Sequence, residues 1–221
     1  MKDYFIIKNC LSKNLCGFLT GYFLLKRRAL KTMLEKGYVS NLDTDQGVFG
    51  DRQVGKAFSI YGDPAAEVVL QILQKKIENN LGFELTPTYA YTRVYDQGSQ
   101  LYRHKDRFSC EFSSTLNLGG DVWPIYLDTT GSDNIVSSFI DETGEVTIIK
   151  TSAPKGTEII LESGDMLIYP GNKMEHWRNP FEGEYCVQTF LHYNKKTNLN
   201  NNIYDGRLHL GLPVGTKNYL K

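Results

Sequence analysis

From Thr88 onward the sequence is a series of short β-type runs separated by turn residues. Aromatic and β-branched side chains are frequent within the runs, while glycine, asparagine and aspartate gather between them. The runs are residues 89–95, 111–118, 122–127, 145–150, 157–161, 166–169 and 185–193. So many short strands at this spacing predict a β-sandwich or β-barrel with helices packed outside it.

Two segments ahead of the strands have the apolar period of amphipathic helices. Across residues 12–36 apolar side chains recur at helical spacing, and Gly37 follows as a suitable C-terminal cap. The second segment has clearer boundaries, because Asp63 is a good N-cap and Pro64 suits the first helical position. Its apolar stripe ends at Gly82. We therefore expect two helices before the β-rich part.

The length of 221 residues is enough for one hydrophobic core, whereas two smaller domains would each bury too little apolar surface. We expect a single α+β domain, residues 1–221, with helical support at about 11–82 and a β core at about 85–195. The polar, glycine-rich residues 40–63 are either a simple connector or a mobile loop over a site. A C-terminal tail, about residues 196–221, either wraps the β core or caps its entrance.

Charge and hydropathy exclude several classes of function. Twenty-five Lys and Arg balance 25 Asp and Glu, so no global field attracts nucleic acid or an anionic membrane. The N-terminus lacks the order of a secretory signal, and the longest apolar stretch, residues 16–25, is too short to span a bilayer. We expect a cytoplasmic protein with no nucleic-acid partner and no membrane association.

The tripeptide His104-Lys105-Asp106 is the first candidate for chemistry. Side chains alternate along an extended strand, so the imidazole and the carboxylate share a face and can bind one ion. A second histidine, His176, follows a turn, an apolar strand and another turn, which places it on a neighbouring strand of the same region. Together these residues predict a metal site, although a surface or packing role for the histidines is the alternative.

Two histidines and one carboxylate on one face of an octahedron are typical of non-haem iron(II) oxygenases. Three coordination positions then stay open. A 2-oxo acid chelates at two of them and dioxygen takes the third. Decarboxylation of the 2-oxo acid then provides an oxidant strong enough to remove hydrogen from an unactivated C–H bond.

Two stretches of the sequence resemble a known family. The stretch from Tyr95 to Arg107, with its tyrosine, glycine and HxD motif, and residues 164–193 around His176 are similar to prolyl 4-hydroxylase-like members of the 2-oxoglutarate and iron(II)-dependent oxygenase superfamily. The resemblance covers roughly residues 88–193. It implies a double-stranded β-helix, a jelly-roll or cupin-like barrel with supporting N-terminal helices and the site in its mouth.

The same resemblance implies a chemistry. Fe(II) would be held by His104, Asp106 and His176, with 2-oxoglutarate and O2 as co-substrates. The enzyme would be a dioxygenase that hydroxylates a C–H bond and releases succinate and CO2. Peptidyl proline is the first guess for the substrate, and a free amino acid, another protein side chain or a nucleotide are the alternatives.

The sequence departs from the family at the anchor for the distal carboxylate of 2-oxoglutarate. The family usually has Lys or Arg nine or ten residues beyond the second histidine, where this chain has Tyr185 and Cys186. A dianion calls for a buried cation, and arginine is the better bidentate partner. Arg178 is our first candidate because it shares a strand face with His176, and its alternative is a solvated surface role. The second candidate is Arg93.

Tyr95 matches a family tyrosine that hydrogen-bonds the co-substrate, and simple packing is its alternative. Arg107 and Glu111, beside the metal strand, either meet the substrate or form an ion pair, which we favour. His192 and His209 lack a matching motif, so we expect structural roles for both. Trp177 should point away from the metal, whereas Trp123 is either a core residue or a pocket wall.

Two other functions compete with the oxygenase. A cupin-like metal enzyme of non-oxidative type uses a similar barrel, but it usually needs more histidine ligands than this chain offers. A non-catalytic jelly-roll binding protein would present loops only, and replacing His104 or His176 would leave its function intact. For the oxygenase, we expect as partners a small-molecule co-substrate and a peptide, protein or small-molecule substrate.

Overall fold

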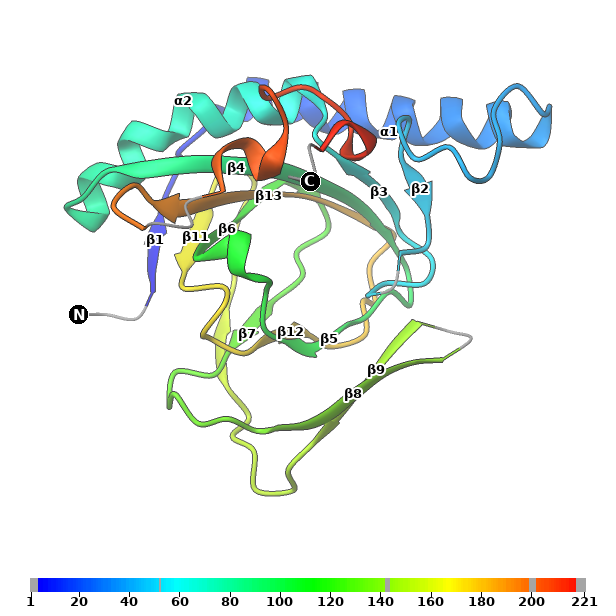
Figure 1. Cartoon of the computed structure of the whole chain (residues 1–221). Helices are drawn as coiled ribbons and strands as arrows, with labels where there is room; N and C mark the ends of the chain where they lie inside the picture. The colour runs from blue at the N-terminus through cyan, green and yellow to red at the C-terminus, as the bar shows by residue number, and fades with distance from the viewer. Residues whose placement is uncertain (1–3, 52, 142–143, 199–201, 218–221) are drawn as a thin grey trace.

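Two antiparallel sheets face each other in the computed structural model, which describes residues 4–51, 53–141, 144–198 and 202–217 (Figure 1). The larger sheet has the order β1 (Phe5–Ile7), β11 (Met166–Tyr169), β6 (Phe112–Gly120), β13 (Tyr185–Lys195), β4 (Leu85–Asp96), β3 (Phe58–Tyr61) and β2 (Val48–Phe49). The smaller sheet has the order β10 (Thr157–Ile159), β7 (Ile125–Leu127), β12 (His176–Arg178) and β5 (Leu101–His104). A separate hairpin consists of β8 (Ile135–Asp141) and β9 (Gly144–Ile149).

The expected α+β class and double-stranded β-helix are confirmed, with one difference. In the described part of the chain the two sheets share no strand pairing, so they do not close into a barrel. Most strands of the smaller sheet are only three residues long, too short to wrap around and pair with the larger sheet. The two sheets therefore lie as separate layers, as Figure 1 shows.

Both helices form where the sequence predicts them. Helix α1 (Lys13–Glu35) begins after Ser12, whose side chain accepts a hydrogen bond from the backbone N–H of Leu15. Helix α2 (Pro64–Leu81) begins after Asp63, which caps the N–H of Ala65, and ends at Gly82 in the left-handed conformation that glycine favours. The two helices cover the outer face of the larger sheet (Figure 1).

Alternation along the two central strands separates the core from the site. On β4, Ala90 and Val94 face the helices, and on β13 Val187 and Leu191 do the same. The intervening side chains face the space between the sheets. They include Tyr89, Tyr91, Arg93, Phe190 and His192, which line a cavity there.

The segment 40–63 is more ordered than its composition indicates. It contains β2 and β3, and Phe58 and Ile60 of β3 are buried. The connector and mobile-loop interpretations are therefore wrong for residues 58–61, because the four-residue run is too short to show a clear strand period. The stretch between β2 and β3 does reach the site, since Asp51 and Gln53 line the same cavity.

Residues 202–217 of the tail pack against the outside of the fold. They contain the short 3-10 helices η2 (Ile203–Gly206) and η3 (Val214–Thr216). Arg207 is buried and pairs with Glu67 of α2, and its guanidinium also donates to the backbone carbonyl of Thr88. Asp205 of the tail also bonds Tyr61 and Arg107, which line the cavity, so the described residues fit both interpretations of the tail. Across all the described residues of the chain, no helix has both the length and the apolar character that crossing a bilayer requires.

Candidate metal centre

His104 and His176 lie opposite each other on adjacent strands. They form a Cα pair between β5 and β12, and their ring centroids are 4.2 Å apart. Asp106 lies just past the end of β5, where its backbone N–H donates to the carbonyl of Gly171 at 2.9 Å. The ordinary strand expected through the HxD motif thus stops at His104. The hydrogen bond to Gly171 holds the backbone of Asp106 in place beside the histidines.

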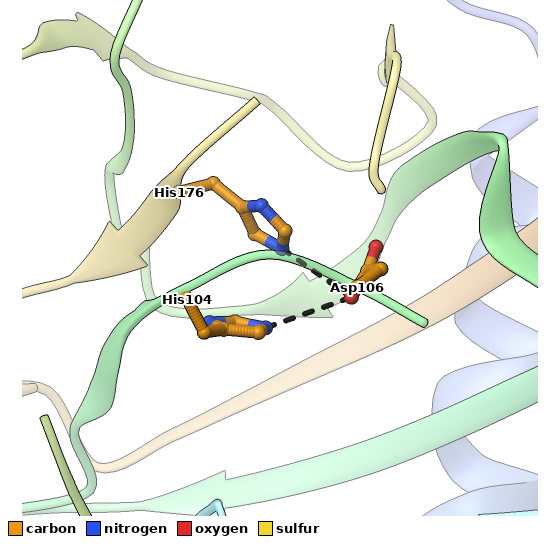
Figure 2. A group of neighbouring side chains, drawn as sticks. All are labelled: His104, Asp106 and His176. Carbon is orange, nitrogen blue, oxygen red and sulfur yellow. Dashed lines mark ion pairs between the residues drawn. The ribbon is translucent and has the colours of Figure 1, made fainter. Parts of the chain in front are cut away.

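The three side chains converge on one point (Figure 2). The Nε2 atoms of His104 and His176 each lie 3.6 Å from Oδ1 of Asp106. Donor atoms about 2.1 Å from one ion, at right angles to each other, are about 3 Å apart, so a small inward movement brings all three into coordination distance. The structure therefore brings together the three residues predicted as metal ligands.

Backbone carbonyls set the tautomers of both histidines. Nδ1 of His104 lies 2.7 Å from the Tyr102 carbonyl oxygen, and Nδ1 of His176 lies 3.0 Å from that of Met174. A carbonyl only accepts, so each Nδ1 carries the proton. Each Nε2 then presents a lone pair toward Asp106, as a metal ligand must.

Electrostatics favour the ligand forms of these groups. Burial alone would raise the pKa of Asp106, but the positive charge of His176, and hydrogen bonds from His104 and His176 when these are protonated, hold that pKa well below its usual range. Burial, with His176 close by, lowers the pKa of His104. At neutral pH the aspartate is therefore ionised and the imidazole of His104 is neutral.

The other carboxylate oxygen of Asp106 is held from the larger sheet. Ser113 on β6 donates to Oδ2 of Asp106 at 2.5 Å, and the Ser113 hydroxyl is 3.1 Å from Nδ1 of His192 on β13. Burial lowers the pKa of His192 to about 4, so this imidazole is neutral. The thiol of Cys110 also lies within 4.8 Å of Asp106 and His192.

A cavity of about 570 Å³ opens beside the three ligands. Its walls come from both sheets and are rich in aromatic rings, among them Tyr61, Tyr89, Tyr91, Tyr169 and Phe190. Arg93 lines the cavity too, but two of its nitrogens already donate to Oδ2 of Asp51, at 2.9 and 2.6 Å. The charge of this second candidate anchor is thus matched within the protein.

A larger cavity, about 750 Å³, lies beside α1 and has no histidine in its lining.

Arg178, the first candidate anchor, is fully buried and incompletely bonded. One guanidinium nitrogen donates to the carbonyl of Trp123, but Nε and Nη2 have no hydrogen-bond partner. Within the described ranges no acidic side chain pairs with Arg178. The hydroxyl of Tyr95 is likewise buried without a partner, and both side chains contact the Trp123 ring. Trp123 is therefore a buried support for these two residues.

A buried ionic network lies behind the metal strands. Arg103, next to His104, donates from Nε to Glu175, next to His176, at 2.7 Å. It also pairs with Asp128 after β7, and its third nitrogen donates to the Pro154 carbonyl at 2.8 Å. The network therefore joins β5, β12 and β7 on the face away from the cavity.

Some sequence expectations need correction. Arg107 does not pair with Glu111. It forms two hydrogen bonds to Asp205 of the tail, at 2.8 and 2.6 Å, while Glu111 accepts a hydrogen bond from the backbone N–H of Lys195.

Trp177 points away from the metal site, as predicted, and its ring stacks on Tyr126.

The two remaining histidines have different environments. His209 is exposed and its ring bonds the adjacent backbone, which fits a structural role. His192 lines the cavity, which a structural assignment does not anticipate. Side-chain alternation along the run 185–193 could have predicted this position, because Gln188, Phe190 and His192 share one strand face.

Comparison with known proteins places the fold. No family model and no curated protein matches the sequence. A prolyl-4-hydroxylase of Pseudomonas putida is a structural neighbour at 15% identity, covering 89% of this chain and 94% of that one, with a TM-score of 0.52. HygX of Streptomyces hygroscopicus, crystallised with nickel and 2-oxoglutarate, matches at 13% identity, 96% and 92% coverage, and a TM-score of 0.55.

AviO1 of Streptomyces viridochromogenes aligns at 10% identity, over 90% of this chain and 93% of that one, with a TM-score of 0.59. At such identities the likeness concerns the backbone alone. This chain therefore has the double-stranded β-helix fold of these proteins.

Proposed function

We propose that the chain is an iron(II) and 2-oxoglutarate-dependent oxygenase that hydroxylates a C–H bond. The observation that carries the proposal is the meeting of two imidazole Nε2 atoms and one carboxylate oxygen at the wall of a cavity. His104, Asp106 and His176 would hold the metal on one side and leave the cavity side open. The nickel and 2-oxoglutarate in the structure of HygX support this assignment.

The co-substrate fits the residues behind the metal. Arg178 follows His176 by two positions in β12, with a register shift in the pairing to β5 between them. Two strand positions span about 6.6 Å, the scale of a five-carbon dicarboxylate held at both ends. A buried guanidinium without an anion is costly, and a carboxylate would satisfy its Nε and Nη2 donors together. The Tyr95 hydroxyl would give the same carboxylate a further hydrogen bond.

Each residue of the candidate site has a defined task in this proposal. When bound, iron(II) with 2-oxoglutarate and O2 supplies the oxidising power, with release of succinate and CO2. The Nδ1 hydrogen bonds keep His104 and His176 in the ligand tautomer. Arg178 and Tyr95 orient the co-substrate, and the aromatic walls exclude water and shape the space for the substrate.

The substrate is the least constrained part of the proposal. Peptidyl proline is the first choice, in line with the prolyl hydroxylase among the neighbours, whereas HygX was crystallised with hygromycin B. The cavity of about 570 Å³ suits a small molecule or one inserted side chain. Screening both classes for succinate release above the uncoupled background identifies the substrate.

Spectroscopy tests the cofactors without a substrate. Anaerobic protein with Fe(II) and 2-oxoglutarate should give a weak visible metal-to-ligand charge-transfer band. Absence of the band from fully metallated protein would overturn the proposal. Titrating 2-oxoglutarate through this band also decides the anchor, because Arg178→Met should raise its Kd at least about tenfold. Arg93→Gln is the matched variant, and a larger effect there would transfer the role to Arg93.

A further inference from the structure

We propose that Ser113 and His192 are positioning residues for Asp106, which together reserve one oxygen of its carboxylate for the metal. The inference deepens the proposed function and depends on it for the identity of the ion. Its basis is a continuous hydrogen-bond chain from His192 Nδ1 through the Ser113 hydroxyl to Oδ2 of Asp106. Oδ1, at 3.6 Å from both ligand nitrogens, is the oxygen left for coordination.

The direction of the chain follows from what each group can donate. An ionised carboxylate only accepts, so the single hydroxyl proton of Ser113 is used on Asp106. The Ser113 oxygen must then accept from His192, which fixes the proton of that imidazole on Nδ1. The Ser113 O–H and the His192 Nδ1–H therefore both point toward the aspartate. A 180° rotation of the Asp106 carboxylate would exchange its two equivalent oxygens and keep the same hydrogen bonds. A bidentate arrangement, however, would break it, because Oδ2 would have to leave Ser113.

The surrounding backbone makes this arrangement rigid. Ser113 and His192 are directly paired between β6 and β13, and both are buried. The ring of His192 packs against Tyr89 with centroids 4.5 Å apart. On the other side, a Cβ atom added to Gly171 would collide with the Ser113 hydroxyl and come within 2.5 Å of Oδ2 of Asp106. The carboxylate is thus enclosed by the serine, the imidazole and a residue that must lack a side chain.

The consequence for the metal is a carboxylate that arrives already oriented. Without the Ser113 hydroxyl, Asp106 could rotate about its side-chain bonds, and binding would have to restrict that motion again. Groups that orient a metal ligand in this way typically change metal affinity by about 10–100-fold when they are removed. The binding of the ion itself, rather than the rate of turnover, is therefore the direct measure of the role.

The test uses the full-length, metal-free protein and Mn²⁺, whose binding is read by electron paramagnetic resonance. Ser113→Ala should raise the Kd for Mn²⁺ about 10–100-fold. Ser114→Ala is the matched control, because Ser114 is equally buried but its hydroxyl donates to the Leu191 carbonyl. This control should keep the wild-type Kd within about twofold, and thermal melting of each metal-free variant shows that it is folded.

A double-mutant cycle shows whether the two residues act as one chain. His192→Phe keeps the ring against Tyr89 but removes the nitrogen, and it should weaken Mn²⁺ binding less than Ser113→Ala does. Combined with Ser113→Ala it should add nothing further, because His192 acts through the serine. Fully additive losses would overturn the chain, and an unchanged Kd in folded Ser113→Ala would overturn the positioning role itself.

The outcomes separate this inference from the proposed function. A wild-type charge-transfer band together with tight Mn²⁺ binding by Ser113→Ala refutes only the positioning role. Mn²⁺ binding that depends on Ser113 in a protein that never gives the band with Fe(II) and 2-oxoglutarate refutes only the oxygenase. A wild-type protein that binds no Mn²⁺ refutes both.

Discussion

The two faces of the smaller sheet each bury an arginine beside a candidate metal-binding histidine, and the two arginines differ in their hydrogen bonding. Arg103 is 5% exposed and lies over the ring of Trp177. Each of its three nitrogens has an acceptor, and two of the acceptors are carboxylates. Arg178 is 1% exposed and lies over the ring of Trp123, yet two of its nitrogens lack acceptors. Burial and aromatic packing are alike, so they do not distinguish a structural arginine from a ligand-binding one.

Hydrogen-bond completeness does distinguish them. On the outer face the protein supplies the counter-charges itself, and Asn134 adds donors to both carboxylates of the network. On the inner face the cation is buried against Trp123 and, in the described ranges, meets no acidic partner. We infer that the first arginine is there for the fold and the second for a ligand.

The largest expected effect is on the outer face. Arg103→Met leaves Asp128 and Glu175 buried together without a cation, which should cost about 3–5 kcal/mol in the free energy of unfolding. Denaturant unfolding of the metal-free protein measures it. Arg27→Met, which removes a half-buried partner of the half-buried Asp96, is the control and should cost less than about 1 kcal/mol. A loss of similar size in both variants would remove the contrast between the two faces.

The matching change on the inner face should act through the ligand instead. Arg178→Met should leave the metal-free protein at least as stable as the wild type, because it removes an unmatched buried charge. With Mn²⁺ present, 2-oxoglutarate at 100 times its wild-type Kd should stabilise the wild type by about 2.7 kcal/mol and the variant by much less. A large loss of stability without ligand would mean that Arg178 is structural as well.

A smaller effect would sharpen how closely the inner face is fitted around Asp106. Gly171→Ala inserts a methyl group against Ser113 and Asp106. The affinity for the metal should therefore fall about tenfold or more, even though Gly171 is not itself a proposed metal ligand. Isothermal titration with Mn²⁺ measures the change. Gly215→Ala, where an added Cβ meets nothing within 4 Å, serves as the control. Equal affinity in the two variants would show that the aspartate has room to move.

The smallest effect concerns another completed ion pair, at the tail. Burial would raise the pKa of Asp205, but the bonds and charges of Arg107 and Lys217, with Tyr61, outweigh it and hold the pKa at about 2. The pKa of Asp205 in the folded protein lies below the ordinary value of 3.8, so this stabilisation is present above about pH 4 and is lost as the pH falls toward 2.

Asp205→Asn should therefore lower the free energy of unfolding by about 1–2 kcal/mol at pH 7. The difference from the wild type should shrink between pH 4 and pH 2, as measured by denaturant unfolding at each pH. A difference that is constant over this range would mean that the carboxylate is not the stabilising group.

Local rules were sufficient for much of the fold and for the grouping of the candidate ligands. The caps at Asp63 and Gly82 depend on neighbouring residues only, and the two-residue spacing of the HxD motif was enough to group His104 with Asp106, although the strand ends at His104. The partners of Arg103 were beyond such rules, because Asp128 and Glu175 are 25 and 72 residues away. Strand β3 was missed for a related reason, since its pairing with β4 is what makes four residues a strand.

The outer network also affects how mutants of this protein must be interpreted. A screen that scores only lost activity would return Asp128 and Glu175 beside the true ligands, because both fix the strands that carry the histidines. An acidic pair so near a proposed metal ligand is easily mistaken for a second cation site. Recording the metal content and the melting temperature of every inactive clone separates the two groups: ligand mutants lose the ion and stay folded, whereas network mutants melt early.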